Sequence, residues 1–148
     1  REIRDLIEKY EISKVWAYNC NFDRNALNTT VRYITKSNVR WFFPYGVEFH
    51  CIWNFACETI LQQKRFFKMA EKENWFSEKG NLKTSAEIAY RYMNKIADFE
   101  EKHTGLQDVL IEVEILAKCY AQHKKADTTI NRMCWRKPTK AYREWLAD

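Results

Sequence analysis

The sequence predicts a helix-rich α/β domain, as a partial fold from which the first strands of the central sheet are missing. Its 148 residues are 46% hydrophobic and 16% aromatic, which is enough apolar surface to bury the core of one domain. The chain has only three glycines and two prolines, so it favours helices over tight turns. Its apolar spacing follows the order helix, strand, helix, strand and then several helices. Two strands are too few for an independent sheet, so we expect the first strands to precede this sequence.

The first half of the chain supplies both predicted strands. A helix opens the chain, because four apolar residues recur there at helical spacing: Ile3, Leu6, Ile7 and Tyr10. The short apolar run 14–18 predicts one strand, and 47–53 predicts the other. A helix that starts near Phe22 lies between them, with apolar residues on one face at Leu27, Val31 and Ile34. An aromatic turn region, 41–46, precedes the second strand.

The second half of the chain is predicted to be helical. One helix follows the second strand and includes Ile60, Leu61, Lys64 and Phe67. Residues 84–87 form a capping box, in which Thr84 opens a helix that runs to Met93. The last clear helix covers about 105–123, and we expect six of its residues to face inward: Leu106, Val109, Leu110, Val113, Leu116 and Tyr120.

Composition argues against several classes of protein. The sequence has no run of 18 apolar residues, so no membrane-spanning helix is predicted, and no stretch resembles a secretory signal. Its five cysteines show no paired spacing, which favours free thiols in a reducing cytoplasm. His50, Cys51 and Cys57 lack the spacing of zinc ligands, and no glycine-rich phosphate loop is present.

The C-terminal segment 124–148 is basic and aromatic. It contains seven Lys or Arg and three acidic residues, and so carries most of the net charge of +5. Cationic groups with Trp135, Tyr142 and Trp145 among them suit a surface that follows a phosphate backbone and stacks on bases. The alternative is a solvated segment whose aromatic side chains pack on the domain.

The segment Asn19–Asp23 is the first candidate site. Asn19 ends the first predicted strand, and Asp23 lies in the first turn of the helix that follows. Ligand sites in open α/β sheets lie at the carboxyl ends of strands, so this position favours a function. The alternative is structural: Asn19 or Asn21 caps the helix, and Asp23 interacts favourably with the helix dipole.

The segment His103–Asp108 is the second candidate site. His103 lies just before a helix and Asp108 in its first two turns. Asp108 is off the apolar stripe that includes Leu106 and Val109, so it is free to face a neighbouring strand. A pair of carboxylates beside an imidazole suits metal-assisted hydrolysis. A single histidine in front of a helix is also common as a cap or a surface group.

Together, the two segments resemble motifs of a known family. The stretch 17–27, Ala-Tyr-Asn-Cys-Asn-Phe-Asp-Arg-Asn-Ala-Leu, resembles the second motif of the DEDDh 3′–5′ exonucleases. These ribonuclease-H-like nucleases include polymerase proofreading subunits and ribonuclease T. The stretch His103–Asp108 with the following Ile111, Glu114, Ile115 and Leu116 resembles the third motif. The resemblance covers most of residues 1–123.

The resemblance implies a role for each matching residue. Asp23 and Asp108 would be metal ligands, His103 the general base that accepts a proton from water, and Asn19 and Phe22 groups that shape the site. Two Mg²⁺ or Mn²⁺ ions about 4 Å apart would assist phosphodiester hydrolysis. The implied substrates are single-stranded nucleic acid 3′ ends, and the sequence leaves DNA or RNA open.

The first family motif, an Asp-x-Glu on a strand, does not occur at the matching place. Asp98 and Glu100 match the Asp-x-Glu pattern in residue type, but they stand shortly before the third motif instead of on an early strand, and we interpret them as surface acids. Four other glutamates are read as solvated or dipole-matching groups: Glu71, Glu73, Glu112 and Glu114. We therefore expect residues 1–123 to be the C-terminal part of an exonuclease-like domain, with 124–148 packed on it. Alone, this chain should bind metal weakly and cleave poorly.

Two other functions remain open. One is a non-catalytic nucleic-acid-binding or scaffold module derived from the same fold, and the other is a helical interaction protein unrelated to nucleases. The aromatic run Trp41–Phe43 fits a core, a base wedge or a docking surface for a polymerase or another replication or repair partner. The oligomeric state is open.

Overall fold

The computed structural model describes residues 2–36 and 38–148 and shows a helix-rich α/β fold with a small parallel sheet. The strands are β1 (Lys14–Ala17) and β2 (Glu48–Cys51). The α-helices are α1 (Glu2–Lys9), α2 (Cys20–Thr29), α3 (Ile52–Glu58), α4 (Lys64–Glu73), α5 (Ala86–Asn94), α6 (Gly105–Tyr120) and α7 (Arg136–Ala147). A π-helical segment, η1 (Thr30–Ile34), extends α2, and a 3₁₀ turn, η2 (Ile60–Gln62), follows α3. Within the described ranges, no helix is both long and apolar enough to cross a bilayer.

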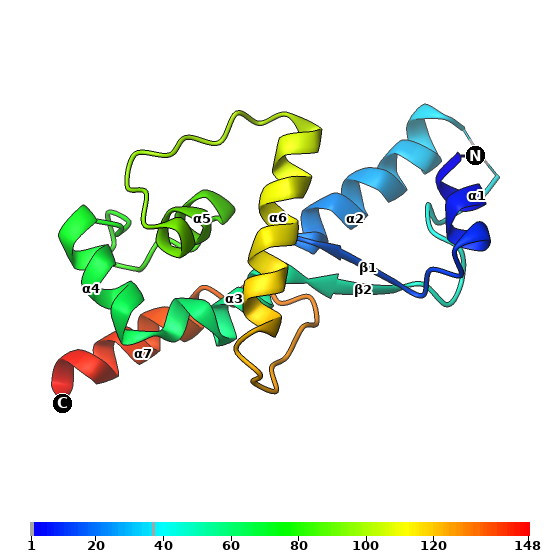
Figure 1. The fold of residues 1–148 in the computed structure, drawn as a ribbon. Coiled ribbons are helices and arrows are strands. Elements are labelled where there is room, and N and C mark those ends of the chain that lie inside the picture. The colour runs from blue at the N-terminus through cyan, green and yellow to red at the C-terminus, as the bar shows by residue number, and fades with distance from the viewer. Residues whose placement is uncertain (1, 37) are drawn as a thin grey trace.

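The strands, α1 and α2 lie at one end of the molecule, and α4, α5 and α7 lie at the other, with α6 between them (Figure 1). β1 and β2 are parallel neighbours, and the crossover that parallel strands require contains α2. On one face of the sheet, Trp16 contacts Phe55 of α3 and Tyr120 of α6. On the other face, Phe49 contacts Arg24 of α2. Helices therefore cover both faces of the strand pair.

The hydrophobic core lies where α3, α4, α5 and α6 meet beside the sheet. Its largest fully buried apolar side chains are Phe66, Phe67, Ile60, Leu61 and Ile115. Ile115 belongs to α6 and the others to α4 and the turn before it. This packing holds the middle of α6 against α3 and α5, and so determines where the first turns of α6 lie.

Helix α6 buries a different face from the predicted one. Its buried residues are spaced four apart: Ile111, Ile115 and Cys119. Four residues predicted to face inward are exposed: Leu106, Val109, Leu110 and Val113. Tyr120 is partly exposed, but its ring contacts Phe55 of the core, as predicted. Leu116, also predicted inward, does pack partly against the core. The prediction was wrong because α6 is apolar around most of its circumference. The spacing of its apolar residues therefore does not identify the buried face, which is determined by the contacts of α6 with α3 and α5.

The N-cap of helix α5 is Ser85, one residue after the predicted N-cap, Thr84. The Ser85 hydroxyl accepts the N–H of Ile88 at 3.3 Å. Thr84 is buried, and its hydroxyl accepts the indole N–H of Trp53 at 2.9 Å. A buried hydroxyl needs a hydrogen-bond partner, and Trp53 supplies one here. Helix α6 also ends at Tyr120, before the predicted end at 123.

A pair of substitutions on α6 tests which face is buried. Ile115→Ala should lower the free energy of unfolding by about 2–5 kcal/mol, because it leaves a cavity in the core. Leu106→Ala removes a similar apolar volume from a side chain that is 73% exposed. This substitution should change the free energy of unfolding by less than about 0.5 kcal/mol. Urea denaturation of both variants measures the difference, and similar losses at the two positions would contradict this packing.

Candidate functional site

The carboxyl end of β1 leads directly into α2 through a left-handed residue. Asn19 has φ 54° and ψ 47°, and its carbonyl accepts the N–H of Phe22 at 2.9 Å. Asparagine tolerates this backbone region better than most residues. The Asn19 side chain makes no capping hydrogen bond, so the predicted cap role is not what the structure shows. Asp23 lies in the first turn of α2, and partial burial raises the pKa of its carboxyl.

A hydrogen bond joins this strand end to α6. The backbone N–H of Tyr18 donates to Oε2 of Glu112 at 3.1 Å. The pKa of Glu112 is raised to about 7, chiefly by burial and also by the negative charges of three nearby carboxylates, Asp23, Glu101 and Asp108. The hydrogen bond from Tyr18 opposes this shift. The three carboxylates come from α2, α6 and the loop before α6, and each lies close enough to Glu112 to raise its pKa.

Glu101, His103 and Asp108 form the closest group within this cluster. One ligand atom from each lies within 4.8 Å of the others, a spacing compatible with a shared metal ion. The Glu101 backbone is held by Glu87 of α5, whose Oε2 accepts the Glu101 N–H at 3.0 Å. His103 has φ 51° and a side chain that is 79% exposed, with Nδ1 4.0 Å from Glu101 Oε2. The imidazole is therefore open to solvent at the edge of the cluster.

The donor set suits a hard divalent cation. Oδ1 of Asp108 is buried and has no hydrogen-bond partner among the described residues. A buried carboxylate oxygen without a partner is costly, and a bound cation would remove this cost. Burial, followed by the charge of Asp108, raises the pKa of Glu101. Oxygen-rich carboxylate groups with an imidazole fit Mg²⁺ or Mn²⁺ better than a thiolate-binding metal.

The predicted site residues fall into two groups in the structure. Asp23, Asp108 and His103 come from the two motifs and lie around one carboxylate cluster. Asn19 and Phe22 flank it at the start of α2, and Phe22 is exposed. The prediction that Glu112 is a solvated group was wrong, because Glu112 is half-buried and accepts from Tyr18.

Sequence reasoning missed the contribution of two glutamates to the cluster. Glu112 is four residues after Asp108, so the two lie on the same face of a helix, and this spacing is visible in the sequence. Glu101 has no comparable signal, because its position depends on the loop that Glu87 holds. In contrast, Asp98 and Glu100 are exposed, in agreement with their reading as surface acids.

Two aromatic side chains of the basic C-terminal segment, Tyr142 and Trp145, pack on the domain. Tyr142 and Trp145 of α7 lie 5.5 and 5.6 Å from the Phe67 ring. Lys137 donates to Asn54 and forms an ion pair with Glu58. For these aromatic residues, the packing interpretation of the segment is the one that the structure shows.

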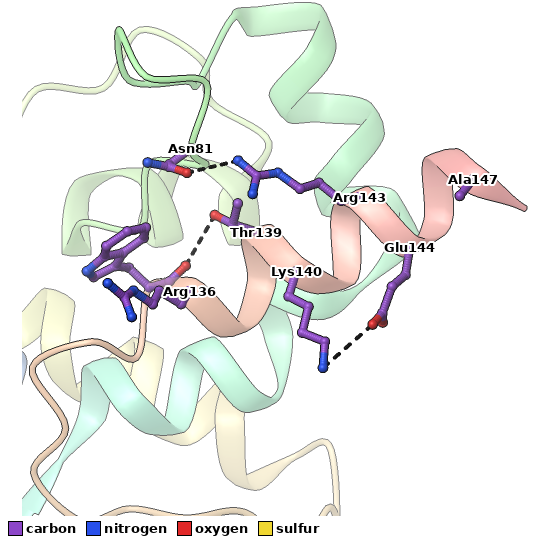
Figure 2. Close-up of a pocket in the computed structure, with 8 residues that line it drawn as sticks. Asn81, Arg136, Thr139, Lys140, Arg143, Glu144 and Ala147 are labelled. Atoms are coloured by element: carbon purple, nitrogen blue, oxygen red, sulfur yellow. Dashed lines mark hydrogen bonds and ion pairs between the residues drawn. The ribbon is translucent and has the colours of Figure 1, made fainter.

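Cations on the outer side of α7 also have partners within the domain. Figure 2 shows Arg143 pointing toward Asn81, to which it donates at 3.2 Å, and Lys140 paired with Glu144 at 3.8 Å. A hollow of about 460 Å³ lies among these groups. One basic residue of the segment approaches the candidate site: Arg132 donates to Asn21 at 3.1 and 3.3 Å when the amide oxygen of Asn21 faces it.

Comparison of the chain with protein-family models, with curated proteins and with solved structures finds no match. Any functional conclusion therefore rests on the residues and geometry of the site.

The raised pKa of Glu112 predicts a pH-dependent effect of removing its charge. The folded state holds the proton more tightly than the unfolded state, whose pKa is near 4.5, so stability falls as the pH rises from 4.5 to about 7. In the presence of a chelator, Glu112→Gln should therefore raise the free energy of unfolding at pH 8 by about 1–2 kcal/mol, after allowance for solvent screening. At pH 4.5 it should change little.

The exposed Glu114 on the same helix is the matched control, and Glu114→Gln should have little effect at either pH. Chemical denaturation at the two pH values measures both variants. An equal effect of Glu112→Gln at pH 4.5 and pH 8 would contradict the assigned electrostatics.

Proposed function

We propose that this protein is a metal-dependent 3′–5′ exonuclease of the DEDDh type that hydrolyses phosphodiester bonds of single-stranded DNA or RNA. The observation that carries the proposal is that Asp23 and Asp108 both act on Glu112, which binds the Tyr18 N–H at the carboxyl end of β1, and that His103 lies beside Asp108. These residues come from segments about eighty positions apart, and they match the two motifs of that family. A cytoplasmic location fits the free, buried cysteines among the described residues.

Each residue of the cluster has a role in this proposal. Asp23 and Asp108 would hold the metal, and the structure supports adding Glu101 and Glu112 to them. Mg²⁺ or Mn²⁺ bound there would stabilise negative charge on the phosphate oxygens. In this proposal the carboxylates alone hold the metal, and the exposed imidazole of His103 beside them is left to accept a proton from a water molecule. Asn19 and Phe22 would contact the terminal nucleotide.

The arrangement of elements supports a partial ribonuclease-H-like fold. β1, α2 and β2 form a parallel crossover unit, and α6 brings its first turns to the carboxyl end of β1. We propose that an Asp-x-Glu pair on a further strand completes the ligand set. In the described ranges, β1 pairs with β2 alone, so its other edge can pair with a further strand. The exposed apolar stripe of α6 can likewise be covered by further residues.

A non-catalytic nucleic-acid-binding module is the second candidate. The observation that favours it is the exposure of both Asp23 and His103. A site that is open to water stabilises transition-state charge less than a water-excluded one. The following two experiments distinguish the candidates.

Metal binding should depend on Asp108. Mn²⁺ should raise the midpoint of thermal unfolding of the wild-type chain, because it binds the folded state. An ion at a free concentration of about 100 times its Kd adds about 2.7 kcal/mol of stability. The shift should be lost in Asp108→Asn and retained in Asp98→Asn, whose carboxylate is exposed outside the cluster. Differential scanning fluorimetry measures it, and equal shifts in the two variants would place the ion elsewhere.

Cleavage should depend on His103. A 5′-labelled single strand with Mn²⁺ should be shortened from its 3′ end, by the chain or by a longer polypeptide that contains it. His103→Ala should slow the reaction by about 100- to 10,000-fold, the range for loss of a general base. His123→Ala, an exposed histidine beyond the other end of α6, should leave the rate unchanged. Gel analysis measures the products, and the absence of any metal-dependent cleavage would favour the binding module.

A further inference from the structure

The aromatic loop, residues 41–47, is held firmly against the rest of the protein. The guanidinium of Arg4 donates to the carbonyls of Trp41 and Phe42 at 3.1 and 3.4 Å. The N–H of Phe42 donates to Oδ1 of Asn28 in α2 at 3.0 Å. Phe43 packs edge-on against Phe49 of β2, with ring centroids 5.2 Å apart. The exposed side chains of this loop therefore extend from a fixed backbone.

A turn at the end of the loop presents Tyr45 to solvent. The N–H of Val47 donates to the carbonyl of Pro44 at 3.4 Å, and Gly46 has φ 91°. This is the pattern of a type II turn, in which glycine occupies the position with positive φ. Tyr45 precedes the glycine and is 107% exposed, with no ring contact to any other described residue. An aromatic ring that is held out in this way offers both faces to a ligand.

Arginine side chains surround the second exposed ring of the loop. Trp41 is 54% exposed, and the guanidinium carbons of Arg32 and Arg40 lie 4.8 and 5.4 Å from its ring centroid. The Arg32 Nε also donates to the carbonyl of Arg40 at 3.3 Å, which ties the two residues together. The loop therefore combines flat apolar rings with cations that stay charged at all relevant pH values.

Between the loop and α2 lies a hollow of about 500 Å³. Its lining is basic, amide or apolar: Arg24, Asn25, Asn28, Trp41, Phe43, Pro44, Tyr45, Gly46, Val47 and Phe49. Arg24 follows Asp23 of the carboxylate cluster directly in α2. From Asp23 to Asn28, the helix axis advances about 7.5 Å, so the hollow begins within a nucleotide or two of the cluster.

We propose that this hollow and the ring of Tyr45 bind the unpaired bases of a single-stranded nucleic acid, upstream of the 3′ end. The Tyr45 ring stacks on a base, and Arg24, Arg32 and Arg40 contact phosphates. This inference rests on the proposed nuclease function for its substrate class, but it assigns a separate site. It also predicts a preference for single strands, because bases in a duplex have no free face for Tyr45.

Charge is the reason to favour nucleic acid over a protein partner. Exposed aromatic residues occur in both kinds of interface, but arginines interleaved with flat rings match a chain of phosphates and bases. The hollow on α7 (Figure 2) differs in this respect, because its Lys140 and Arg143 already pair with Glu144 and Asn81. Lys140 is therefore a suitable control position for loss of a positive charge.

Binding of a labelled oligodeoxythymidine of about 16 nucleotides tests the inference, by fluorescence anisotropy with a chelator present so that no cleavage occurs. Tyr45→Ala should weaken binding by about 5- to 100-fold, the effect of losing one stacked base. Tyr10→Ala removes another exposed tyrosine and should leave affinity unchanged. Arg40→Gln should reduce the slope of log affinity against log salt by about one, and Lys140→Gln should not.

The outcomes separate this inference from the proposed function. If Asp108→Asn abolishes cleavage but Tyr45→Ala binds as tightly as wild type, the inference is overturned and the nuclease stands. If no cleavage occurs with Mn²⁺ but Tyr45→Ala weakens binding, the inference stands and the nuclease fails. Equal affinity for a duplex and a single strand, or no affinity for either, would overturn the inference, and in the latter case the loop would be a protein docking surface.

Discussion

The hydrogen bond from the Tyr18 N–H to Glu112 is the interaction on which the candidate site depends. It brings a side chain of α6 to the carboxyl end of β1, at the residue that precedes the Asn19 turn into α2. Asp23 of α2 and Asp108 of α6 both raise the pKa of this half-buried glutamate, so the carboxylates of the two motifs lie close to the same side chain.

Such an arrangement is unfavourable unless the rest of the fold enforces it. Ile115 lies in the core about one turn after Glu112. The packing of α6 on α3 and α5 therefore offsets the electrostatic repulsion within the cluster. On the other side, Glu87 fixes the backbone of Glu101. Among the described residues, the buried Oδ1 of Asp108 has no hydrogen-bond partner, and this is the observation that best fits the proposed cation site. Local strain and repulsion of this kind concentrate at functional sites.

Much of this site can be predicted from the sequence, because motifs encode local positions. The first-turn position of Asp23 and the place of His103 before α6 follow from short-range patterns, and the strand before Asn19 ends at Ala17, two residues earlier than predicted. The buried face of α6 cannot be predicted in this way, because the helix is apolar on several sides and the packing of neighbouring helices determines which side is buried. The same limit applies to Glu101, whose position depends on the contact of its backbone with Glu87 of α5. Glu112 shares a helix face with Asp108, which the sequence does indicate, but its contact with Tyr18, 94 positions away, does not follow from the sequence.

The central claim is that one cation site unites the end of β1 with the start of α6. Paramagnetic broadening of backbone amide signals by substoichiometric Mn²⁺ tests it directly in solution. We expect the signals of Tyr18, Asp23, Asp108 and Glu112 to broaden together and before those of exposed acids elsewhere. Selective broadening around distant exposed acids such as Glu78 and Glu144, or broadening on α6 without any at Tyr18 and Asp23, would contradict the claim of one cation site.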